Sequence, residues 1–293
     1  MNQFSGKIKV SDFDLKYTVE SAQPLTFLAD ILNEGRHIGY VSGSSHINVK
    51  QEGDVLRYGS IPSLGGLKLK KEIEKRFALK EDMQKIYESI ATDKFLADSI
   101  ERYPGMRVTE NDPWETTVCF VISQFNNVKR IRLIVRKLID TYGERTTVEV
   151  GGKSFVIKSF PTPQVLAQES VKDLMKCGTG FRGKYIKGVA EACSDSFDLY
   201  KLYNKKYHMA KEELMTLPGI GDKVADCILL MGYKKPEAFP VDTWIKRIVE
   251  RVYFNGRKQS VKNIHAFADK MWPGNQGIAQ QYLFWAGRSL KIN

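Results

Sequence analysis

Cysteine and histidine are scarce in this sequence of 293 residues, and neither is clustered. The four cysteines are Cys119, Cys177, Cys193 and Cys227, which are widely separated and include no C-x-x-C pair, and only four histidines are present. Zinc and iron–sulfur sites take their ligands from closely spaced cysteines and histidines. We therefore expect no site of either kind.

Long apolar runs are also absent. No stretch approaches the roughly 20 apolar residues that a membrane-spanning helix needs. The first residues, from Met1 to Lys7, lack the apolar segment of a secretory signal. We therefore expect an intracellular protein.

Negative charge is in short supply. The chain has 34 Asp and Glu against 45 Lys and Arg, which gives a formal net charge of +11 and a pI near 9.3. This excess favours a polyanionic partner, and nucleic acid is the commonest one, although an anionic membrane surface would attract the same charge.

The hydrophobic pattern changes once along the chain. Alternation from about residue 7 to 60, including Phe13 to Val19 and short runs at 38–41, 47–49 and 55–58, predicts an antiparallel sheet. Beyond residues 62–66 the spacing is helical over most of the chain. The exception is a compact β-hairpin predicted at about 146–158, around Gly151-Gly152.

These patterns predict the α+β class and two domains. We expect an N-terminal β-rich domain with trailing helices at residues 1–105. A mostly helical domain should follow at residues 106–293, with the β-hairpin as a small insertion. At 293 residues the chain is long enough for a full core in such an arrangement.

The most informative stretch is LPGIGDKVADC, from Leu217 to Cys227. Gly219 and Gly221 surround one apolar residue and predict a tight hairpin. A helix should begin at Gly221, which places Lys223 in its first turn. There the helix dipole opposes a positive charge and so favours the neutral, nucleophilic amine. From this residue alone, an ordinary solvated lysine is the alternative.

Asp242 ends the segment Pro240-Val241-Asp242, nineteen residues after Lys223. It precedes an apolar-periodic run, so its default role is that of a helix N-cap. The second interpretation is a carboxylate that faces Lys223.

A polar loop, Gln124 to Asn127, interrupts a helix that is predicted to start at Asp112-Pro113. The loop contains one aromatic residue, Phe125, and basic residues from Lys129 onwards follow it. A DNA-distorting wedge needs this combination. A solvated turn between two helices is the alternative.

The LPGxG hairpin, the lysine two residues on and the aspartate of the PVD segment resemble the helix-hairpin-helix DNA glycosylase superfamily. The continuation KVADC, Lys223 to Cys227, is most similar to its 8-oxoguanine glycosylase/lyase branch. The resemblance covers about residues 60–290 and implies a helix-hairpin-helix at about 209–233.

That resemblance implies a bifunctional DNA glycosylase and AP lyase of base excision repair. Such an enzyme flips 8-oxoguanine, opposite cytosine, out of double-stranded DNA and excises it through a lysine Schiff base, followed by β-elimination. Lys223 would be the nucleophile and Asp242 its acidic partner. We expect the protein to act as a monomer, because it would bend one lesion site at a time.

The same resemblance implies roles for three further groups of residues. The base pocket would be formed by Ala22, Cys227, Gln280 and Phe284. The wedge and the contacts to the opposite base would come from Phe125, Asn126, Asn127, Arg130, Phe181 and Arg182. DNA phosphates would be contacted by Gly219, Gly221 and Trp244.

No cofactor is implied except a monovalent cation at the hairpin, held by the main-chain carbonyls of Met215, Leu217 and Ile220. The C-terminal four-cysteine cluster of relatives such as endonuclease III is missing from the sequence, so no iron–sulfur cluster is expected.

The sequence departs from the family pattern at four positions. Phe125 stands where a gap-filling asparagine is usual, and Phe181 where a tyrosine is usual. Trp244 replaces a phosphate-contacting histidine. Ala22 aligns loosely with a glycine whose carbonyl senses the N7 proton of 8-oxoguanine.

Two other functions stay open. A monofunctional glycosylase of the 3-methyladenine type shares the layout and the aspartate but lacks a lysine at the equivalent of Lys223. In a non-catalytic helix-hairpin-helix module, Lys223 would contact phosphate and Asp242 would only cap a helix. Covalent trapping distinguishes such a module from a lyase.

Overall fold

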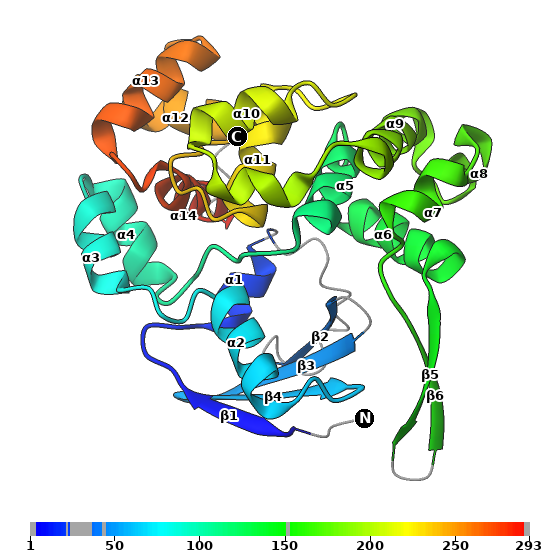
Figure 1. Cartoon of the computed structure of the whole chain (residues 1–293). Helices are drawn as coiled ribbons and strands as arrows, with labels where there is room; N and C mark the ends of the chain where they lie inside the picture. The colour runs from blue at the N-terminus through cyan, green and yellow to red at the C-terminus, as the bar shows by residue number, and fades with distance from the viewer. Residues whose placement is uncertain (1–3, 22, 24–36, 43–44, 151–152, 290–293) are drawn as a thin grey trace.

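The computed structural model describes residues 4–21, 23, 37–42, 45–150 and 153–289. Figure 1 shows a small sheet at one end of the molecule, helices in the remainder, and a two-stranded hairpin that projects from the helical part. The α+β class expected from the sequence is therefore confirmed.

The sheet has four strands in the order β1-β4-β3-β2, and all neighbours are antiparallel. The strands are β1 (Gly6–Lys9), β2 (His37–Ser42), β3 (Ser45–Glu52) and β4 (Val55–Ile61). Alternate residues of β3, such as Ile47 and Val49, are fully buried. The three short strands predicted near residues 38–41, 47–49 and 55–58 are confirmed.

The strand expected over Phe13 to Val19 is wrong, because this segment forms helix α1 (Leu15–Glu20). The Asp14 side chain caps the helix by accepting a hydrogen bond from the backbone N–H of Tyr17 at 2.8 Å. Leu15, Thr18 and Val19 are buried at the three- and four-residue spacing of a helix. A capping aspartate and tertiary burial therefore outweigh the local alternation.

Helices make up most of the chain after β4. They are α2 (Gly66–Arg76), α3 (Met83–Ile90), α4 (Lys94–Arg102), α5 (Pro113–Ser123), α6 (Val128–Tyr142), α7 (Pro163–Gln168), α8 (Val171–Lys176), α9 (Gly183–Asp195), α10 (Tyr207–Leu214), α11 (Asp222–Gly232), α12 (Thr243–Tyr253), α13 (Val261–Met271) and α14 (Gln276–Ser289), with 3-10 turns η1 (Gly180–Arg182) and η2 (Leu199–Asn204). The predicted start at Asp112-Pro113 is confirmed: Asp112 caps α5, and Pro113 is its first residue.

The buried side chains form two main clusters. The smaller one lies between the sheet, α1 and α2, and includes Leu56 and Ile73. The larger one lies among the later helices, and α3 and α4 contribute Ile90 and Leu96 to it. These helices belong to the segment that we assigned to the N-terminal part, and the boundary near residue 105 stays a prediction.

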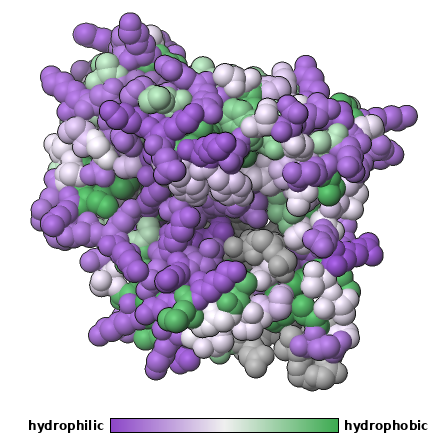
Figure 2. All heavy atoms as spheres, in the orientation of Figure 1, coloured by the Kyte–Doolittle hydropathy of each residue, from purple (hydrophilic) through white to green (hydrophobic). Residues whose placement is uncertain are grey.

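The hairpin predicted at about 146–158 is confirmed as β5 (Arg145–Val150) and β6 (Lys153–Lys158). On the face shown in Figure 2, hydrophilic side chains cover much of the surface, and hydrophobic ones occur in small scattered groups. Within the described residues, every helix is too short or too polar to cross a membrane.

Candidate active site

Helix α11 places three side chains on one pocket of about 330 Å³. Lys223, Cys227 and Met231 follow at four-residue spacing, so they lie on the same face of the helix. The other walls come from α5, α14, the segment that leads into α12 and the residues next to the end of α1. The pocket therefore joins segments from both ends of the chain.

Lys223 lies in the first turn of α11, as predicted. Its Nζ is 5.8 Å from the centre of the Phe120 ring. Burial raises the pKa of the neighbouring Cys227 thiol to about 11, and Lys223 offsets part of this rise. Cys227 is therefore a neutral thiol at physiological pH, and the amine is bordered by weakly polar groups.

Asp242 caps a helix and also lines the pocket of Lys223, while its role as the acidic partner of that lysine stays a prediction. It is the N-cap of α12, where its Oδ1 accepts a hydrogen bond from the backbone N–H of Ile245 at 2.8 Å. It also lines the pocket that contains Lys223. Among the described residues, no ion pair within 4 Å joins Asp242 and Lys223.

Helix α14 forms the opposite wall through Gln280 and Phe284. The Gln280 Nε2 donates to the Pro240 carbonyl at 3.3 Å, while its buried Oε1 has no partner among the described residues. Because a carbonyl can only accept, the orientation of this amide is determined, and the free atom is an acceptor. Ala22 lies outside the described residues, but its neighbours Ser21 and Gln23 line the pocket.

The predicted hairpin between α10 and α11 depends on Gly219. Its φ is +75°, a left-handed conformation that favours glycine, and a Cβ there would overlap the ring of Tyr185. Gly221, the N-cap of α11, has a φ of −97° and open space around its Cα. The close packing of Gly219 therefore brings the hairpin backbone onto α9.

We expect Gly219→Ala to lower the free energy of unfolding by about 1–3 kcal/mol, because it adds both left-handed strain and overlap with Tyr185. Gly221→Ala is the matched control and should cost less than about 1 kcal/mol. Urea denaturation of both variants measures the difference. Equal losses would contradict the packing assigned to Gly219.

The predicted wedge loop carries Phe125 at the surface, with 95% of the residue exposed and a φ of +47°. The Phe125 and Phe181 rings meet edge to face, 6.4 Å between centres. Asn127 caps α6 through its Oδ1, which accepts from the Arg130 N–H at 3.0 Å. Asn126 donates from its Nδ2 to the Ile122 carbonyl at 3.1 Å. The loop thus presents an exposed aromatic pair on a hydrogen-bonded base.

Arg182 is hydrogen-bonded to the main chain of this loop. Its guanidinium donates to the main-chain carbonyls of Gln124, with Nε at 2.6 Å, and of Phe125, with the terminal nitrogen at 2.9 Å. It also lies over the Phe181 ring, 4.5 Å from the centre. Arg130, by contrast, is exposed. Contact between Arg182 and an unpaired base would require some of these carbonyl bonds to be exchanged.

Two further predicted groups lie near the pocket. Trp244, in the first turn of α12, is 37% exposed and lines the pocket. Met215, Leu217 and Ile220 belong to the turn between α10 and α11, and the Leu217 carbonyl accepts the Ile220 N–H at 3.2 Å. Neutral carbonyl oxygens suit a monovalent cation. The cation site itself stays a prediction.

A comparison with known proteins identifies the family. Residues 118–274 match the family described as HhH-GPD superfamily base excision DNA repair protein, and residues 6–117 match the 8-oxoguanine DNA glycosylase N-terminal domain. The chain belongs to the HhH-GPD superfamily. Among curated relatives of this superfamily, a probable N-glycosylase/DNA lyase of Methanothermobacter thermautotrophicus is 30% identical, with 95% of this chain and 94% of the relative covered.

Solved structures of similar proteins extend over nearly the whole chain. MBOgg1 in complex with a low affinity DNA ligand has a TM-score of 0.88 at 34% identity, covering 97% of this chain and 96% of that one. The Clostridium acetobutylicum 8-oxoguanine glycosylase/lyase, bound to double-stranded DNA with cytosine opposite 8-oxoG, has a TM-score of 0.86 at 26% identity. The match covers 98% of this chain and 99% of that chain. The likeness to these structures therefore includes the N-terminal sheet as well as the helical part.

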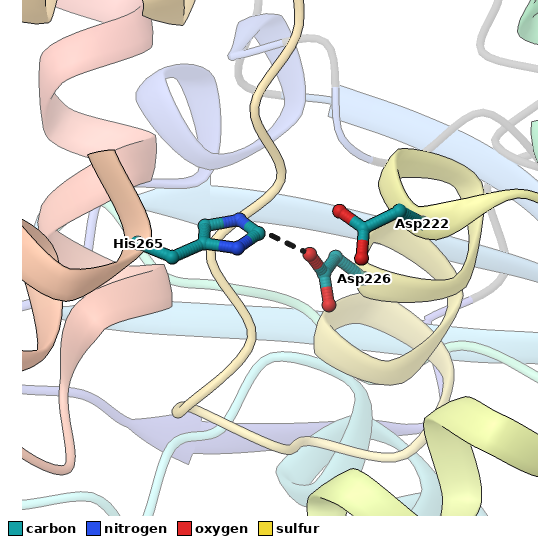
Figure 3. Close-up of side chains that lie close together, drawn as sticks. All are labelled: Asp222, Asp226 and His265. Atoms are coloured by element: carbon teal, nitrogen blue, oxygen red, sulfur yellow. Dashed lines mark ion pairs between the residues drawn. The ribbon is translucent and has the colours of Figure 1, made fainter. Parts of the chain in front are cut away.

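A polar network behind the pocket anchors the HhH-GPD helix α11. Figure 3 shows Asp222 and Asp226 of α11 with His265 of α13, whose Nε2 is 3.6 Å from Asp226. The Lys211 ammonium contacts Asp222 at 2.9 Å and the buried Asp226 at 2.8 Å. The Tyr207 hydroxyl donates to Asp226 at 2.6 Å. Because Lys211 and Tyr207 of α10 and His265 of α13 all contact aspartates of α11, we interpret the network as one that fixes the position of α11, and hence of Lys223.

Sequence reasoning missed several residues that line the pocket. Met231 and Arg288 could have been found, since each lies four residues after a predicted pocket residue on the same helix. Phe120, Ser21 and Gln23 carry no such signal. They reach the pocket only because α5 and the end of α1 pack against α11 and α14.

Proposed function

We propose that this protein is a bifunctional DNA glycosylase and AP lyase of base excision repair that removes 8-oxoguanine opposite cytosine from double-stranded DNA. The observation that carries the proposal is the pocket shared by Lys223, Asp242 and Gln280, whose Oε1 has no partner among the described residues. The two 8-oxoguanine glycosylase structures and the N-glycosylase/DNA lyase relative support it. Because its substrate is DNA, the protein would act inside the cell. We also propose that it acts as a monomer.

The proposed chemistry uses two groups. Neutral Lys223 attacks C1′ of the flipped nucleotide, the bond from C1′ to N9 breaks, and its electron pair leaves with the base. The Asp242 carboxylate stabilises the positive charge that develops on the sugar. Loss of a C2′ proton from the resulting Schiff base then expels the 3′ phosphate and nicks the strand.

The pocket is suited to a guanine-type base. Gln280 offers a free acceptor, and the Watson–Crick edge of guanine presents N–H donors to it. Cys227, held as a neutral thiol, and Phe284 would pack on the two faces of the base. The main-chain carbonyl of Ala22 remains the proposed contact to the N7 proton of 8-oxoguanine.

The surface around the pocket would hold the distorted duplex. Phe125 and Phe181 are placed to stack where the base has left, and we keep Arg130 and Arg182 as the groups that contact the opposite cytosine, with Asn126 and Asn127 shaping the loop. The N–H groups of Gly219 and Gly221 and the Trp244 indole would contact phosphates. Met215, Leu217 and Ile220 would hold the proposed monovalent cation, and no chemical step depends on it.

Borohydride trapping tests the function. The protein is incubated with a duplex that has one 8-oxoguanine opposite cytosine, and reduction should give a covalent protein–DNA band. A matched duplex with 3-methyladenine in place of the lesion should give little or none. Excision of 3-methyladenine without any covalent band would instead indicate the monofunctional glycosylase. Binding of both duplexes without excision of either base would indicate a non-catalytic module.

Gln280→Leu should lower the rate of 8-oxoguanine excision by about 10- to 100-fold, because the base edge would lose its buried partner. Single-turnover kinetics measure this loss. The same variant should nick a duplex with a preformed abasic site at the wild-type rate, since no base remains to be recognised. A comparable loss on both substrates would show that Gln280 supports the pocket rather than recognising the base.

A further inference from the structure

A second cavity lies at the other end of helix α5. Its volume is about 660 Å³, and it is bordered by the start of α5, the chain around residues 159–164 and the segment after α9. Ser123, at the C-terminal end of α5, lines the pocket of Lys223, whereas Glu115 lines this cavity. The two residues are about 12 Å apart along the helix axis, at about 1.5 Å per residue. The cavities are therefore distinct.

This cavity is lined by acidic residues, whereas the chain as a whole carries a net positive charge. Among the residues that the structure describes, no Lys or Arg lines it, although the chain has 45 such residues. Five acidic residues do: Asp112, Glu115, Glu144, Asp195 and Asp198, of which Asp198 also pairs with Lys201 at 3.9 Å. Aromatic side chains alternate with them: Trp114, Phe160, Phe197 and Tyr200. Such a surface repels DNA phosphate and attracts cations.

Glu115 is the unusual member of this set. It is only 4% exposed, and its Oε2 has no hydrogen-bond partner in the described structure. Capping of α5 does not use this carboxyl, because Asp112 Oδ1 accepts the Glu115 N–H at 3.0 Å. Asp112 Oδ2 accepts the Tyr200 hydroxyl at 2.7 Å. Buried polar groups are normally paired, so a carboxyl oxygen without a partner in the described structure is an exception, and Glu115 is also one of the residues that line this cavity.

The chemistry of the walls selects the kind of cation. A metal ion needs several ligand atoms close together, and among the described residues only Asp222, Asp226 and His265 form such a group, which lies elsewhere. Here no three carboxylates of the described residues come within 4.8 Å of one another, and aromatic side chains line the same cavity. Carboxylates combined with aromatic faces bind ammonium groups with aliphatic stems.

We propose that this cavity binds an organic ammonium group, with Glu115 as the buried counter-ion and the exposed Glu144 and Asp195 as further acidic contacts. The group could be carried by a free aliphatic polyamine or by a lysine side chain. Burial and the charge of Asp112 raise the pKa of Glu115 to about 8, and Arg76 offsets part of this rise. A bound cation would favour its ionised form, so binding should release a proton near neutral pH.

Isothermal titration calorimetry of the full chain tests the site with two probes: spermidine, and a short peptide with one lysine and blocked ends. We expect saturable binding at one site for at least one of them. Glu115→Gln should weaken it by about tenfold or more, because a buried charge partner is lost. Asp195→Asn, at an exposed position, should weaken it about two- to fivefold.

Glu212→Gln is the matched control, since it removes the same charge at an exposed position of α10 outside the cavity. Binding of spermidine alone would identify a polyamine site, and binding of the peptide alone a lysine side chain; either supports the proposal. No saturable binding of either probe at millimolar concentration would overturn it. Equal weakening in Glu212→Gln and Asp195→Asn would overturn it too, and this comparison holds even if Glu115→Gln does not fold.

Discussion

Lys223→Gln should abolish the covalent intermediate and lower the rate of base excision by at least about a thousandfold, because the chain would lose its nucleophile while the rest of the pocket remains. Glutamine removes the amine, which lies 5.8 Å from the centre of the Phe120 ring, and keeps the first two methylene groups of the side chain. Borohydride trapping and single-turnover excision on 8-oxoguanine opposite cytosine measure the two effects.

The control for this variant is Lys172→Gln, which removes the same charge from an exposed position of α8. It should trap and excise like the wild type. Lesion-containing duplex should still bind to Lys223→Gln within a few-fold of the wild-type affinity, since the proposed wedge and phosphate contacts are unchanged. A covalent band that persists in Lys223→Gln would assign the Schiff base to another amine.

Asp242→Asn should lower the excision rate by about 10²–10³-fold and leave the fold nearly as stable as the wild type. Asparagine and aspartate are about equally good N-caps, so the bond from the Ile245 N–H to residue 242 can be kept. Only the negative charge beside the developing positive sugar is lost. Single-turnover kinetics and urea denaturation measure the two quantities on the same protein.

Asp242→Ala separates the two roles of this residue. It should lose activity to a similar extent and, in addition, about 1 kcal/mol of the free energy of unfolding, because the cap of α12 is removed. If Asp242→Asn kept the wild-type excision rate, Asp242 would serve only as a cap, and another group would have to stabilise the sugar cation.

Local chemistry explains the parts of the fold that were predicted well. The start of α5 follows from Asp112 and Pro113, and the hairpin at Gly219 from a backbone conformation that glycine tolerates. Local chemistry also explains why the strand expected at residues 13–19 was wrong. Alternating apolar residues fit a short helix as well as a strand. The hydrogen bond from the Tyr17 N–H to Asp14 shows that Asp14 caps a helix here.

The candidate site was predictable where its residues share one helix. Lys223 and Cys227 on α11, and Gln280 and Phe284 on α14, lie four residues apart and line one pocket. The opposite case is Arg182, whose bonds to the Gln124 and Phe125 carbonyls join segments 57 and 58 residues apart. No local pattern indicates that a guanidinium will be used in this way.

The sequence by itself determined the class of the fold, the hairpin, the lysine and aspartate of the proposed chemistry, and the family that they resemble. These features depend on residue identity and on spacing within one helix, turn or cap. Only the tertiary structure decided which acceptor in the pocket is free and where the acidic cavity lies. Among the described residues, Gln280 Oε1 has no partner because its Nε2 meets the Pro240 carbonyl, and Glu115 Oε2 has none, while Asp112 rather than Glu115 caps α5. Both outcomes depend on which polar atoms are already paired once the chain has packed.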